Sequence, residues 1–201
     1  MRPVVSYVLI AAVAGFVGAS FSAAPAIADK ISQHFGSQQK DPDGFWTTPA
    51  IDGYGKIHFE SDAAYKPAAG DSNKVVFQIT KAENSPAEPN LGLERVARVV
   101  NLYIASGVPQ EQLKFVVSVT GDGTPAMLNN EQYKKLFGID NPNLKLIDGL
   151  RAKGVDVSVC DQSVAFHHFQ HDWIDQSVTH ALSSPTTVAT LENQGYAFLA
   201  M

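Results

Sequence analysis

The sequence contains a single cysteine, Cys160, at the end of a stretch whose pattern predicts a β-strand. Val155, Val157 and Val159 alternate with polar residues, and a period of two is typical of a strand. Polar residues follow directly, so we expect the thiol at the carboxyl end of the strand, where open α/β sheets bind their ligands. An accessible thiolate at that position could act as a nucleophile and carry a sulfur atom. The alternative is a buried cysteine that serves only as a small apolar side chain.

A glycine-rich loop at residues 120–124 offers further groups that could bind a ligand. The loop follows another predicted strand, so we expect it to line the same crevice as Cys160. Its spacing matches no phosphate-binding motif and Asp122 would repel a phosphate, which favours a plain tight turn as the alternative. The candidate ligand-binding residues around the cysteine are Thr120, Gly121, Asp161 and Gln162.

Three histidines close together after the cysteine suggest a metal site as a further alternative. If residues 166–173 form one helix, His167 and His171 share a face and could chelate Zn²⁺ or Cu²⁺, with Cys160 or Asp172 as a further ligand. If these residues are not helical, His167, His168 and His171 are solvated loop side chains. No H-E-x-x-H motif is present, so we predict no resident metal or cofactor as the first choice.

The amino-terminal residues have the features of a secretory signal peptide. One positive charge precedes an apolar run at residues 4–17, and Ala26-Ile27-Ala28 has the small-x-small form of a cleavage site. We therefore expect residues 1–28 to be removed and the mature protein to be periplasmic or secreted, without stable membrane insertion. The alternative is an uncleaved membrane anchor. An exported chain with one cysteine cannot form an internal disulfide.

The charge of the chain argues against polyanion partners. The whole sequence has 15 Lys and Arg against 20 Asp and Glu, a net charge of −5. Removal of the signal peptide takes away one more cation, Arg2, and no acid. No cluster of basic residues is present to neutralise phosphates, so we expect no nucleic-acid partner.

Hydrophobic periodicity predicts an α/β domain at residues 74–201. Apolar runs of strand length lie at 74–80, 113–119, 155–160, 178–182 and 196–200. Helical patterns lie between them, at 91–106, 131–137, 143–153 and 185–193. Alternating strands and helices indicate a mostly parallel five-stranded sheet with helices on both faces. Residues 29–73 are rich in turn-forming residues and read as an irregular extension, with at most one short strand near 54–59.

The order of several short segments resembles that of the DsrE/DsrF-like family over roughly residues 74–201. The segments are 74–80, Asn101-Leu102-Tyr103, Asn141-Pro142-Asn143, 150–155, Val159-Cys160-Asp161-Gln162-Ser163 and Gln194-Gly195-Tyr196-Ala197-Phe198. The resemblance implies a flavodoxin-like three-layer fold, compact homo-oligomers and, in the sulfur-relay members, a persulfide-carrying cysteine after the third strand. Cys160 occupies that position. Asp161 stands where exported relatives usually have glycine, and Thr120 where they often have histidine.

These observations lead to one functional hypothesis and two alternatives. We expect an exported protein that uses Cys160 to bind or relay a small sulfur species, as a carrier or binding protein rather than a classical enzyme. Its expected partners are a small sulfur compound or a sulfur-relay protein, and further copies of its own chain. The alternatives are an oligomeric scaffold with a structural cysteine and a histidine-based metal-binding module.

Overall fold

A computed structural model describes residues 41–201, of which 43–201 form one compact unit. The predicted signal peptide and residues 29–40 lie outside the described residues. Within residues 41–201, no helix has the length and apolar character needed to cross a membrane.

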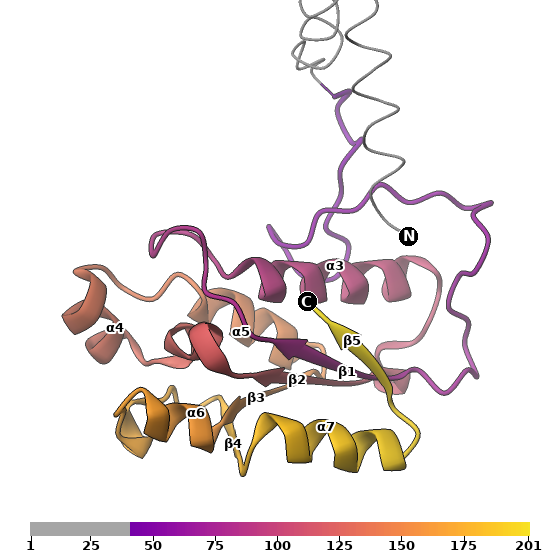
Figure 1. Cartoon of the computed structure of the whole chain (residues 1–201). Coiled ribbons are helices and arrows are strands. Elements are labelled where there is room, and N and C mark those ends of the chain that lie inside the picture. The colour runs from indigo at the N-terminus through magenta and orange to yellow at the C-terminus, as the bar shows by residue number, and fades with distance from the viewer. Residues whose placement is uncertain (1–40) are drawn as a thin grey trace, which may run out of the picture. The chain divides into compact units, whose positions relative to one another are not determined.

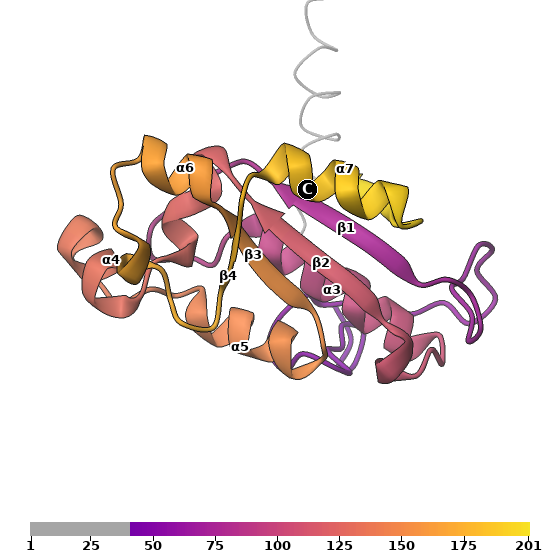
Figure 2. The ribbon, with the colours of Figure 1, turned by 90° about the horizontal axis from the view of Figure 1, so that it is seen from below.

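Five parallel strands form one sheet in the order β4-β3-β2-β1-β5. The strands are β1 (Lys74–Ile79), β2 (Lys114–Val119), β3 (Asp156–Cys160), β4 (Thr179–Ala181) and β5 (Ala197–Ala200). The α-helices are α3 (Leu91–Ala105), α4 (Asn130–Phe137), α5 (Leu144–Ala152), α6 (Asp161–Phe166) and α7 (Ser184–Asn193). Helices α3 and α5 cover one face of the sheet, and α6 and α7 lie on the other (Figures 1 and 2). The prediction of a three-layer, parallel α/β fold is confirmed.

The face of the sheet toward α3 and α5 carries the hydrophobic core. Alternate residues of β1 and β2, such as Phe77 and Phe115, point to this face and are buried. Their rings pack edge to face, with centroids 5.3 Å apart. Helix α3 contributes Val96 and Val100 from positions four residues apart, so both lie on the same face of the helix. The regular spacing of apolar residues therefore explains why helix α3 packs against β1 and β2.

The opposite face of the sheet is more polar. Ser118 of β2 and Gln78 of β1 both donate hydrogen bonds to the hydroxyl oxygen of Ser184, at 2.9 and 2.8 Å. Ser184 is the first residue of α7 and is fully buried. Side-chain hydrogen bonds thus supplement apolar packing in holding α7 against the sheet.

Residues 47–57 of the extension pack on helix α3 of their own domain. Asn101 of α3 is fully buried, and its side-chain oxygen accepts hydrogen bonds from the amides of Ala50 and Ile51, both at 2.9 Å. Its side-chain nitrogen donates to the carbonyls of Tyr54 and Gly55, also at 2.9 Å. In place of the short strand expected near residues 54–59, this segment makes a single antiparallel bridge, from Thr47 to Ile57.

Candidate functional site

The loops after β2 and β3 meet at the carboxyl edge of the sheet. The two strands are neighbours, with Val119 opposite Val159, so the residues that follow them lie side by side. Ser163 of α6 joins the loops, because its hydroxyl oxygen accepts hydrogen bonds from the Gly121 amide and the Thr124 hydroxyl, both at 2.8 Å. The structure therefore brings together the two loops that the sequence predicts at one crevice.

Cys160 lies at this edge as the last residue of β3 and directly precedes helix α6. Its side chain is only 3% exposed. It pairs in register with Ala181 of β4 and follows Ser158 by two positions. Residues two apart on a strand face the same side of the sheet, so Cys160 belongs with Ser158 on the more polar face, toward α7.

A groove of about 430 Å³ runs along this face between the edge strand β4 and helix α7. Its lining residues come from β2, β3, β4, α7 and the turn before α7, and they are Val116, Asp156, Ser158, Thr179, Ala181, Leu182, Thr186, Thr187, Thr190 and Leu191. Cys160 is not among them, although its strand neighbour Ser158 and its register partner Ala181 are. A small molecule in the groove would lie close to the backbone that carries the thiol.

The four predicted ligand-binding residues directly follow Cys160 or follow the neighbouring strand β2, and all four have protein partners. The Gly121 amide donates to Ser163, and its carbonyl oxygen lies 3.0 Å from His167 Nε2. Gln162 is exposed, and its side-chain nitrogen donates to the carbonyl of Leu182 at 3.2 Å. Asp161 contacts two histidines, described next. Thr120 directly follows β2 and is half-buried, and its amide donates to the Ile79 carbonyl at 2.9 Å.

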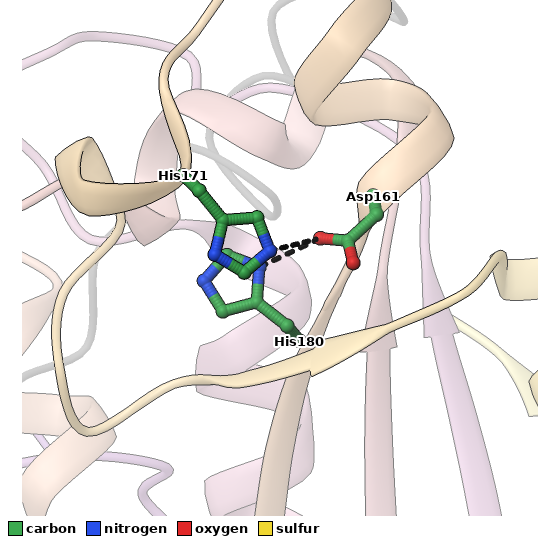
Figure 3. Close-up of side chains that lie close together, drawn as sticks. All are labelled: Asp161, His171 and His180. Carbon is green, nitrogen blue, oxygen red and sulfur yellow. Dashed lines mark hydrogen bonds and ion pairs between the residues drawn. The ribbon is translucent and has the colours of Figure 1, made fainter.

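Asp161 forms a compact cluster with His171 and His180 (Figure 3). One carboxylate oxygen, Oδ1, lies 2.6 Å from His180 Nδ1 and 3.5 Å from His171 Nε2. The imidazole rings are stacked, with centroids 3.3 Å apart and planes 16° from parallel. The residues come from the start of α6, the short 3₁₀ helix His171–Trp173 and the middle of β4.

Residues 166–173 do not form the single helix that would place His167 and His171 on one face. Helix α6 ends at Phe166, and His168 has a left-handed backbone with φ of 57°. His167 instead lies beside the Gly121 carbonyl and stacks on Phe169, with ring centroids 5.3 Å apart. His171 joins Asp161 and His180. Sequence reasoning missed His180, because it lies on a different strand and no spacing rule relates it to Asp161.

Comparison with known proteins identifies one family. The model of the DsrE/DsrF-like family matches residues 73–201. Among solved structures, a protein of unknown function, MTH1491 from Methanobacterium thermoautotrophicum, is similar at 16% identity with a TM-score of 0.46, covering 63% of this chain and 97% of that one. No curated protein matches the chain.

Proposed function

Because the chain belongs to the DsrE/DsrF-like family, which is implicated in sulfur relay, we propose that it binds or relays a small sulfur species through Cys160. The observation that carries this proposal is the position of the chain's single thiol, at the carboxyl end of β3 and next to the groove along β4. The thiolate would attack the outer sulfur of a persulfide donor, forming a persulfide on Cys160 and releasing the donor's thiolate. This exchange consumes no oxidant, so a sulfur carrier needs no reaction besides the exchange itself.

The burial of Cys160 implies that transfer requires a local opening. The hydrogen bond from Gln162 to the Leu182 carbonyl ties the start of α6 to the segment that follows β4. The bond therefore joins the two segments directly beyond the pair of Cys160 and Ala181. Strand β4 has three residues and lies at the edge of the sheet, and short edge elements open at a lower free-energy cost than central ones.

Export and self-association complete the proposal. Removal of residues 1–28 would deliver the protein to the periplasm or the exterior. Strand β5 is an edge strand whose four residues are all exposed, including the apolar side chains of Phe198 and Leu199. An exposed apolar edge favours pairing with another chain, which supports a homo-oligomer.

The test is to incubate the untagged protein with a low-molecular-weight persulfide and record its intact mass. We expect a gain of about 32 Da that disappears in Cys160→Ser, because one sulfur atom is added to the thiol. Native-state alkylation of the unmodified protein measures access in parallel. No mass gain, together with alkylation of Cys160 only after denaturation, would refute the proposal and favour a scaffold with a structural cysteine.

Removal of the Gln162 hydrogen bond tests the opening step. We expect Gln162→Ala to accelerate native-state alkylation of Cys160, because the start of α6 is then released from Leu182. Gln110→Ala is the matched control: Gln110 is also exposed and donates to a backbone carbonyl, that of Ala152 at 3.0 Å, but it precedes β2 at the other end of the sheet. Equal alkylation rates in the two variants would contradict this route to the thiol.

A further inference from the structure

The geometry points to a binding site for a divalent transition metal, with Zn²⁺ as the simplest occupant, formed by Asp161, His171 and His180. This site is separate from the proposed sulfur chemistry and does not depend on it. The three residues each offer one ligand atom, and these atoms all lie within 4.8 Å of one another. Two imidazoles and a carboxylate are a donor set that zinc and related metals bind in proteins.

The distances between the ligand atoms fit a zinc ion that takes the place of the hydrogen bond between Asp161 and His180. Zinc bonds of 2.0–2.2 Å in tetrahedral geometry place neighbouring ligand atoms about 3.3 Å apart. The separation of 3.5 Å between Asp161 Oδ1 and His171 Nε2 is close to this value. The 2.6 Å separation from His180 Nδ1 is that of a hydrogen bond, which is broken when the metal enters, so this pair would move apart by about 0.7 Å. Such a shift is within the range of side-chain rotation.

The two histidine rings are stacked beside the carboxylate, with centroids 3.3 Å apart and planes 16° from parallel. A metal lies in the plane of the imidazole that binds it, so at least one ring would rotate for His171 and His180 to hold the same ion. The negative charge of Asp161 would attract a divalent cation to this position.

Three protein ligands leave the fourth coordination position open. His171 is the most exposed of the three, with 67% of its side chain accessible, while the side chains of Asp161 and His180 are 30% and 24% accessible. The open position would therefore face solvent and take water or a small anion. Structural zinc sites have four protein ligands, so this arrangement is of the open kind.

Titration calorimetry with Zn²⁺ on the untagged, chelator-treated protein tests the site. We expect one Zn²⁺ per chain, and affinities lower by more than about 100-fold in Asp161→Asn and His171→Ala, since loss of a direct ligand exceeds the effect of losing an outer partner. His168→Asn is the control, because His168 is exposed nearby and asparagine tolerates its left-handed backbone. This variant should bind Zn²⁺ like the wild type.

X-ray absorption of the zinc-loaded wild-type protein provides an independent readout. We expect nitrogen and oxygen neighbours and no sulfur, and Cys160→Ser should bind Zn²⁺ with unchanged affinity. Failure of the wild type to bind Zn²⁺, unchanged affinity in His171→Ala, or sulfur bound to the metal would each overturn the inference. Because none of these results depends on persulfide transfer, the two proposals can fail separately.

Discussion

The attachment of the extension to helix α3 through Asn101 leads to a quantitative prediction. Substitution by alanine removes the side chain that satisfies four backbone groups: the amides of Ala50 and Ile51 and the carbonyls of Tyr54 and Gly55. Asn101 is fully buried, so water does not replace all of the lost partners without rearrangement. We therefore expect Asn101→Ala to destabilise the domain and to loosen residues 50–55.

The expected magnitude follows from the number of hydrogen bonds. Each contributes about 1 kcal/mol net, and an amide left buried without a partner costs about 1–3 kcal/mol. Movement of the extension would let water reach part of the site and offset some of this cost. We expect the free energy of unfolding to fall by about 3–5 kcal/mol, a large part of the 5–15 kcal/mol that is typical of a domain.

Denaturant unfolding followed by circular dichroism measures the loss, and limited proteolysis reports on the extension. Asn193→Ala is the matched control, because Asn193 is exposed at the end of α7 and its truncation should change stability by less than about 0.5 kcal/mol. A loss below about 1 kcal/mol in Asn101→Ala, with unchanged proteolysis of residues 43–60, would refute the reasoning.

Two further predictions concern pH and backbone conformation. Burial, and then the hydrogen bond with Glu83, raises the pKa of Tyr133, so the folded state holds this proton more tightly than the unfolded chain. The stability that this proton provides is present below about pH 10 and is lost above it. In denaturant titrations, the difference in stability between the wild type and Tyr133→Phe should therefore narrow from about pH 9 to about pH 11. A difference that stays constant over this range would contradict the proposed cause. Gly55 has φ of 61° and an added Cβ would strike the backbone of α3, whereas Gly53 has φ of 78° and open space around it. Gly55→Ala should therefore lower the free energy of unfolding by about 2 kcal/mol more than Gly53→Ala, and equal losses would argue against close packing of the extension.

The sequence alone was sufficient for the five strands and for four of the five α-helices that the structure describes, whereas helix α6 was not predicted. The alternation of Val155, Val157 and Val159 predicted β3, and the helical spacing of apolar residues predicted α3, because both patterns arise from local backbone geometry. The position of Cys160 at the end of a strand followed from the same alternation. The resemblance to the DsrE/DsrF-like family rested on segments of this kind, and the family match over residues 73–201 confirms it.

The tertiary structure alone decided which side chains meet. His180 lies beside Asp161 because β4 pairs with β3 in a register that sets Val159 opposite His180, and no local pattern encodes that register. The same limit applies to the burial of Cys160. Local periodicity reports the conformation of a segment, whereas a site depends on contacts between segments far apart in the chain. The fold was therefore predictable from the sequence, and the Asp161, His171 and His180 cluster was not.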